Sequence, residues 1–117
     1  MSLIESYADG TVLIIQYANA RILDETTIGN VDREVNAAID KTEDPNVVLD
    51  FSKVAFMSSS MLGRLVKLNK KCKEYKVNLA LCGISKDIME VFKMTKLNKL
   101  FNIQPDIPSA RQSLLKR

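Results

Sequence analysis

The segment from Val47 to Leu65, VVLDFSKVAFMSSSMLGRL, constrains the fold more than any other part of the chain. Two apolar runs, one ending before Asp50 and one ending at Met57, precede three consecutive serines, after which apolar residues recur at helical spacing. The pattern predicts that the serines lie in a turn between a strand and a helix. At such a position the free backbone N–H groups and the helix dipole favour an anion. A serine here is therefore either a helix cap or a residue whose phosphate would be locally stabilised.

The rest of the chain alternates between strand and helix patterns, and we expect one domain over residues 1–117. Apolar, β-branched runs predict strands at residues 3–7, 11–17, 47–51 and 77–82, with a short last strand near residue 103. Helical spacing predicts helices at about residues 25–39, 61–75 and 86–94, and a final helix that opens at 105–108. This alternation favours right-handed parallel crossovers, and the first two strands form an antiparallel hairpin. We therefore predict an α/β fold with a mixed, mostly parallel sheet of four to five strands and about four helices.

The composition argues against most classes of enzyme. The chain has no histidine, which removes the usual serine–histidine and cysteine–histidine mechanisms and most zinc sites. We therefore expect a protein that is not an enzyme and that uses no metal ion or cofactor. The two cysteines, Cys72 and Cys82, are expected to be reduced core residues rather than a redox or disulfide pair.

Charge and hydropathy limit the other partners. The net charge of +3 is mildly basic, but few aromatic residues lie among the lysines to stack on bases, so we expect no nucleic-acid partner. No apolar run approaches the roughly 20 residues of a membrane helix. The first ten residues also lack the basic segment and apolar stretch of a signal peptide. The sequence therefore predicts a cytoplasmic protein with no membrane insertion.

Two blocks, VVLDFSKVAFMSSSMLG and VNLALCGISKDIMEVFKMTKLNKLFNI, precede the terminal helix. In this order and spacing they resemble the STAS domain of anti-sigma-factor antagonists. The family pattern has an aliphatic strand ending in aspartate, a serine turn that leads to leucine and glycine, and a leucine–cysteine–glycine strand end. A segment running from threonine to leucine–phenylalanine follows. The resemblance is close from Val47 onward, roughly two thirds of the chain, and the earlier part matches in the order of its elements.

The resemblance implies a non-enzymatic switch. A partner kinase, itself the anti-sigma factor, would phosphorylate one serine of the turn, and a metal-dependent serine phosphatase would reverse the reaction. The unphosphorylated form would bind the kinase and thereby free a sigma factor. Matched residue by residue, Ser59 falls on the phosphoacceptor, Ser60 on the second serine, Leu62 on the leucine and Gly63 on the closing glycine.

Two positions depart from the family pattern. Ser58 replaces the aspartate that usually precedes the acceptor, which removes a negative charge beside it. Met61 replaces the glycine after the serine pair, and we expect it either to pack inward or to contact a partner. These departures favour a second hypothesis, in which the domain is a constitutive scaffold or an accessory subunit of a lipid transporter. Such a protein would use the same surface without phosphate.

The predicted partner surface surrounds the serine turn. It consists of Asp24, Ser58, Ser60, Met61, Gly63, Arg64 and Lys67. Asp24 belongs to the loop before the first helix, which the topology places near the serine turn, and it also fits the role of a helix cap. Arg64 and Lys67 share one helix face with Lys71, where they either meet an acidic partner or form a solvated face. Asp50 is expected to interact with the backbone of the nearby turn.

Overall fold

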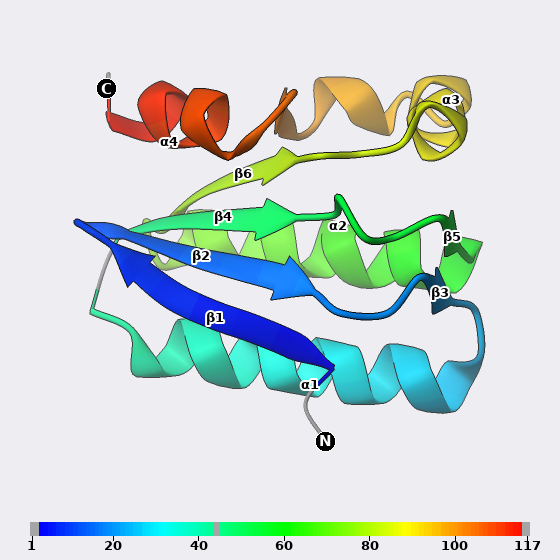
Figure 1. Ribbon diagram of the computed structural model, residues 1–117, viewed down its shortest axis with the longest axis horizontal. Helices are drawn as coiled ribbons and strands as arrows, with labels where there is room; N and C mark the ends of the chain where they lie inside the picture. Colours follow the sequence, from blue (N-terminus) through cyan, green and yellow to red (C-terminus); the bar gives the residue numbers. More distant parts are fainter. Residues whose placement is uncertain (1–2, 44, 116–117) are drawn as a thin grey trace.

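The computed structural model describes residues 3–43 and 45–115, and its centre is a five-stranded sheet (Figure 1). The strands are β1 (Ile4–Asp9), β2 (Val12–Tyr17), β4 (Asn46–Asp50), β6 (Asn78–Cys82) and β7 (Asn102–Gln104), in the spatial order β1-β2-β4-β6-β7. β1 and β2 are antiparallel, and the other pairings are parallel. The prediction of a mixed, mostly parallel sheet is confirmed.

Four α-helices flank this sheet in the part of the chain that the structure describes. They are α1 (Glu25–Lys41), α2 (Ser59–Glu74), α3 (Lys86–Met94) and α4 (Ile107–Leu115), with a 3-10 helix η1 (Leu97–Lys99) before β7. Side chains of the first three α-helices pack into one core with one face of the sheet, and side chains of α4 pack against the other face. Within residues 3–43 and 45–115, no helix has both the length and the apolar character needed to cross a bilayer.

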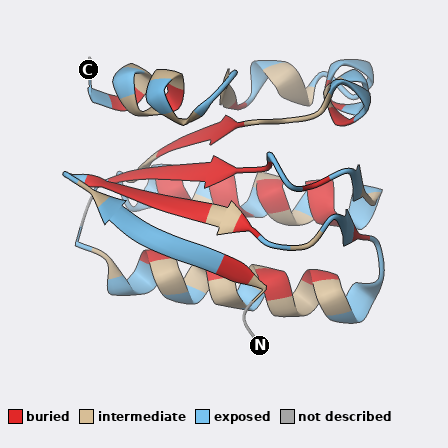
Figure 2. Ribbon diagram, viewed as in Figure 1, coloured by how far each residue is buried: buried red, intermediate tan, exposed pale blue. Residues whose placement is uncertain are grey.

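The side chains of β2 alternate between these two cores because neighbouring strand residues point to opposite faces. Leu13, Ile15 and Tyr17 pack with α1 and α2, whereas Val12 and Ile14 pack against α4. With both faces covered, a strand has to be apolar along most of its length. Figure 2 shows β2 and β4 as mostly buried and the edge strand β1 as mostly exposed.

A second, two-stranded sheet is present that the sequence does not predict. β3 (Arg21–Ile22) pairs in parallel with β5 (Phe56–Met57). The N–H groups of Ala55 and Phe56 also donate to the Ala20 carbonyl, at 2.8 and 3.0 Å. Strands of two residues are too short to show a periodic pattern, so the sequence indicates only an apolar run here. This small sheet determines where the chain enters α2.

Three helix predictions need correction. α2 begins at Ser59, two residues before the predicted Met61, because Ser58 acts as its cap. The helical spacing predicts an inward position for Val91 and leaves Leu115 available for packing, but these residues are 40% and 44% exposed. Each lies next to an inward-facing residue in sequence, and one residue corresponds to a rotation of about 100° around a helix. The apolar stripes of α3 and α4 are therefore narrower than predicted.

Cys72 and Cys82 are both buried, which confirms their predicted place in the core. Burial raises the pKa of both thiols, and the nearby Asp50 carboxylate helps to raise the pKa of Cys82 to about 12. The Cys82 sulfur lies 3.8 Å from Asp50 Oδ1.

The folded protein is therefore expected to react very slowly with a thiol reagent such as dithionitrobenzoate at pH 8, because only the thiolate is a nucleophile. The same protein unfolded in guanidinium chloride should release the coloured product rapidly from both cysteines. Absorbance during the two reactions measures the difference. Rapid, complete labelling of the native protein would contradict the buried, protonated thiols.

Candidate functional site

The serine turn lies where the chain leaves the β3–β5 sheet and enters α2. Ser58 is extended, with φ −82° and ψ 164°, and its side-chain oxygen accepts a hydrogen bond from the N–H of Met61 at 3.4 Å. The N–H of Ser58 donates to the Ile22 carbonyl in β3 at 3.1 Å. Ser58 is therefore the cap of α2. Because it is also bonded to β3, the start of the helix is held in one place.

Ser59 and Ser60 are the first two residues of α2, and both are exposed. Their N–H groups belong to the first helical turn, where no earlier turn supplies carbonyl acceptors. The positive end of the helix dipole lies at the same position. An oxygen anion attached at Ser59 would therefore lie beside hydrogen-bond donors, and the residue is open to another protein.

A second helix N-terminus lies beside the serine turn. β3 and β5 are parallel with Ile22 opposite Met57, so Asp24 and Ser58, which follow these strands, lie at the same edge. Asp24 caps α1, and its Oδ2 accepts a hydrogen bond from the N–H of Thr27 at 3.0 Å. This hydrogen bond holds the pKa of the Asp24 carboxyl below its usual value. Figure 1 shows that α1 begins at the end of the domain that carries β3 and β5.

Two exposed apolar side chains lie next to the turn. Leu23 follows β3 and is 42% exposed, and Phe56 in β5 is 52% exposed. The guanidinium carbon of Arg21 lies 5.1 Å from the centre of the Phe56 ring, a cation–π contact. Leu23 and Phe56 are not among the partner residues that the sequence predicts. The apolar run around Phe56 gave no sign of which side chains would remain uncovered.

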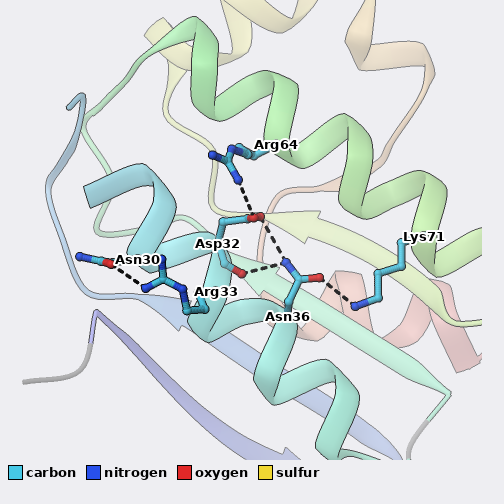
Figure 3. Close-up of polar contacts among 6 residues, drawn as sticks. All are labelled: Asn30, Asp32, Arg33, Asn36, Arg64 and Lys71. Carbon is cyan, nitrogen blue, oxygen red and sulfur yellow. Dashed lines mark hydrogen bonds and ion pairs between the residues drawn. The ribbon is translucent and has the colours of Figure 1, made fainter. Parts of the chain in front are cut away.

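Arg64 and Lys71 are bonded to α1 and do not extend freely into solvent (Figure 3). Arg64 Nη1 lies 3.1 Å from Asp32 Oδ2. Lys71 Nζ donates to Asn36 Oδ1 and to Asp40 Oδ1, both at 2.9 Å. A surface ion pair contributes at most about 1 kcal/mol. The side chains of Arg64 and Lys71 are nevertheless already bound to carboxylate or amide groups of α1.

The remaining predicted partner residues divide into two groups. Gly63 and Lys67 are exposed on α2. Met61 is 2% exposed and belongs to the main core, so of the two options for this residue the structure shows inward packing. The structure thus brings together, at one edge of the domain, Asp24, Ser58, Ser59 and Ser60, with Gly63, Arg64 and Lys67 further along α2.

Asp50 organises the loop that leads to the serine turn, and it is only 4% exposed. Its Oδ1 accepts a hydrogen bond from the N–H of Ser52 at 3.0 Å, so its backbone contact lies in the turn directly after β4 and not in the serine turn. Its Oδ2 accepts hydrogen bonds from Ser52 Oγ at 3.1 Å and from Gln16 Nε2 at 2.9 Å. Within the described residues, no group of three or more acidic or cysteine side chains is placed to hold a metal ion.

The fold and the site define a small α/β domain that presents an exposed serine at the start of a central helix. The chain belongs to the STAS domain family, whose model matches residues 4–110. Among solved structures, it is similar to an anti-sigma-factor antagonist (STAS) domain protein from Planctomyces limnophilus, with 24% identity, coverage of 97% of this chain and 96% of that one, and a TM-score of 0.78.

Two further solved structures share the fold. One is an anti-sigma factor antagonist from Mycobacterium paratuberculosis, with 19% identity, coverage of 94% of this chain and 91% of that one, and a TM-score of 0.83. The other is the Bacillus cell fate determinant SpoIIAA in its phosphorylated form, with 13% identity, coverage of 88% and 92%, and a TM-score of 0.64. The predicted family and fold are confirmed.

Proposed function

We propose that this STAS domain is an anti-sigma-factor antagonist, a binding switch without catalytic activity of its own. Its partners are a serine kinase that acts as the anti-sigma factor and a serine phosphatase, both in the cytoplasm. The family supports this general role, since two of the similar structures are named as anti-sigma-factor antagonists and the third is a phosphorylated protein. In this proposal the unphosphorylated form binds the kinase.

The observation that carries the proposal is the exposed Ser59 at the first position of α2, next to a cap residue that is bonded to β3. A phosphate on Ser59 would add roughly two negative charges. The host helix tolerates these charges because its N-terminus presents donors and a positive dipole. A partner surface that accommodates a neutral hydroxyl would instead meet a strongly hydrated anion. The fold is preserved and the affinity for the partner changes.

The partner surface in this proposal combines polar and apolar groups. Its polar part is formed by Asp24, Ser58, Ser60, Gly63, Arg64 and Lys67. Leu23 and Phe56 add exposed apolar area beside Ser59, and such side chains are frequent anchors of protein interfaces. Met61 is not part of this surface in the proposal, because its side chain is buried and supports the first turn of α2.

A second candidate function is favoured by Ser58. A serine caps α2 as well as an aspartate would, but it leaves no acidic group beside the acceptor for a kinase to recognise. The domain would then be a constitutive scaffold, or an accessory subunit of a lipid transporter, that uses the same surface without phosphate. Neighbouring kinase and phosphatase genes would support the switch, and neighbouring transporter genes would support the scaffold.

Mass spectrometry of the protein purified from its native host tests the proposal directly. We expect a fraction of the molecules to carry one phosphate, on Ser59 and not on Ser58 or Ser60. Treatment with a serine phosphatase before analysis serves as the control. If no serine of the turn carries phosphate under any growth condition, the proposed phosphorylation switch is wrong, and the result favours the constitutive function instead.

A further inference from the structure

A cavity of ≈ 320 Å³ lies at the far end of α2 from the serine turn. It is bounded by the second half of α2, the start of β6 and the segment from η1 into β7, and its lining includes Asn69, Lys73, Lys99, Leu100 and Phe101. Asn69 comes ten residues after Ser59, which corresponds to about 15 Å along a helix. None of the lining residues belongs to the proposed partner surface, and the cavity volume is at the lower limit for small-molecule sites, about 300–1,000 Å³.

Asn69 has hydrogen-bonding capacity that the described protein does not use. The residue is only 6% exposed and its side-chain amide has no hydrogen-bond partner among the residues that the structure describes, while the polar atoms of the amide still reach solvent. An asparagine amide offers two donors and one acceptor oxygen, and those of Asn69 are not engaged by the described protein. Asn102, on the same lining, differs because its Nδ2 donates to Ser113 Oγ at 2.9 Å. A ligand group in the cavity would give Asn69 the partner that it lacks.

The charge of the cavity indicates which ligand fits. Lys73 and Lys99 both line it, and no acidic side chain does. Neither lysine forms an ion pair within the described residues, in contrast to Lys71 on the same helix, which pairs with Asp40. Leu100 and Phe101 provide an apolar wall. The site therefore combines two cations without an ion-pair partner, one amide without a protein partner, and apolar surface.

We propose that this cavity binds a small organic anion, with a phosphate or carboxylate group held by Lys73, Lys99 and the amide of Asn69. The apolar part of the ligand lies against Leu100 and Phe101. The anionic oxygens accept hydrogen bonds from both ammonium groups and from Asn69 Nδ2, and hydrogen bonds to a charged group are the stronger kind. This site does not depend on the phosphorylation of Ser59, so either proposal can fail without the other.

Titration of the isotopically labelled protein in NMR spectra tests the site with three probes: inorganic phosphate, phenyl phosphate and benzoate. We expect saturable shifts of the Asn69 side-chain amide and of the backbone amides around Phe101. Phenyl phosphate should bind more tightly than inorganic phosphate because its ring contacts the apolar wall. The comparison of phenyl phosphate with benzoate then identifies the preferred anionic group. Absence of saturable shifts with all three probes would overturn the proposal.

Two variants and one control distinguish specific binding in the cavity from nonspecific attraction of anions to surface lysines. Asn69→Leu and the double variant Lys73→Gln/Lys99→Gln should each weaken binding about tenfold or more, because the first loses one charge-assisted hydrogen bond to the anion and the second loses two. Lys70→Gln/Lys93→Gln removes the same charge from exposed positions that do not line the cavity, and it should bind like the unmodified protein. An equal loss in the control double variant, or unchanged binding by Lys73→Gln/Lys99→Gln, would refute the site.

Discussion

Ser59→Asp is expected to weaken binding to the kinase partner about a hundredfold, whereas Ser59→Ala should bind as tightly as the unmodified protein. A charge brought into an interface without a partner costs roughly 3 kcal/mol, which corresponds to this change in Kd. The variant should still fold, because a carboxylate at the N-terminus of a helix stabilises it by about 0.3–1 kcal/mol. Isothermal titration calorimetry with the purified kinase measures both affinities, and a thermal melt confirms that both variants are folded.

Ser60→Asp is the matched control for this experiment. It adds the same charge one residue further along α2, on a serine that is also exposed and that points about 100° away around the helix. If Ser59 is the position that the partner covers, Ser60→Asp should lose less affinity than Ser59→Asp. Equal binding by Ser59→Asp and Ser59→Ala would show that charge at this position does not control docking.

The parts of the fold that depend on local patterns are predictable from the sequence. Val47, Val48 and Leu49 form a continuous apolar run, and the structure covers both faces of this strand as such a run requires. Ser58, Ser59 and Ser60 precede an apolar repeat of helical spacing, so the strand-to-helix turn follows from local chemistry alone. The sequence therefore places the candidate serine at a helix start without knowledge of the tertiary structure.

The surroundings of the serine depend on contacts between distant residues, and these are not visible in any local pattern. β3 and β5 have two residues each and pair across 35 positions, from Arg21 to Phe56. The exposure of the Phe56 side chain depends on which other residues pack against this small sheet. The periodicity of the sequence does not contain that information. The ion pair between Arg64 and Asp32 likewise joins two helices, so Arg64 resembles a free basic side chain when α2 is considered alone.

Gly83→Ala is expected to destabilise the protein by about 2–4 kcal/mol, the largest stability effect that we predict for a single methyl group. Gly83 has φ +68°, a conformation that costs other residues about 1–2 kcal/mol. A Cβ at this position would also lie 2.7 Å from Asp50 Oδ1 and 2.9 Å from the backbone nitrogen of Ser52. The methyl group must therefore displace the carboxylate that organises the loop before the serine turn.

Urea unfolding followed by circular dichroism measures this loss of stability. Gly29→Ala is the matched control, because it is inside α1 and no group other than its chain neighbours and the backbone of its own helix lies within 4 Å of its Cβ position. That substitution should stabilise the protein by about 0.5–1 kcal/mol, since alanine is the better helix former. If the two substitutions changed the free energy of unfolding by the same amount and in the same direction, the close approach of Gly83 to Asp50 would be contradicted. Because Ser52 and Asp50 direct the chain toward β5, a destabilised loop should also weaken partner binding in Gly83→Ala although Ser59 itself is unchanged.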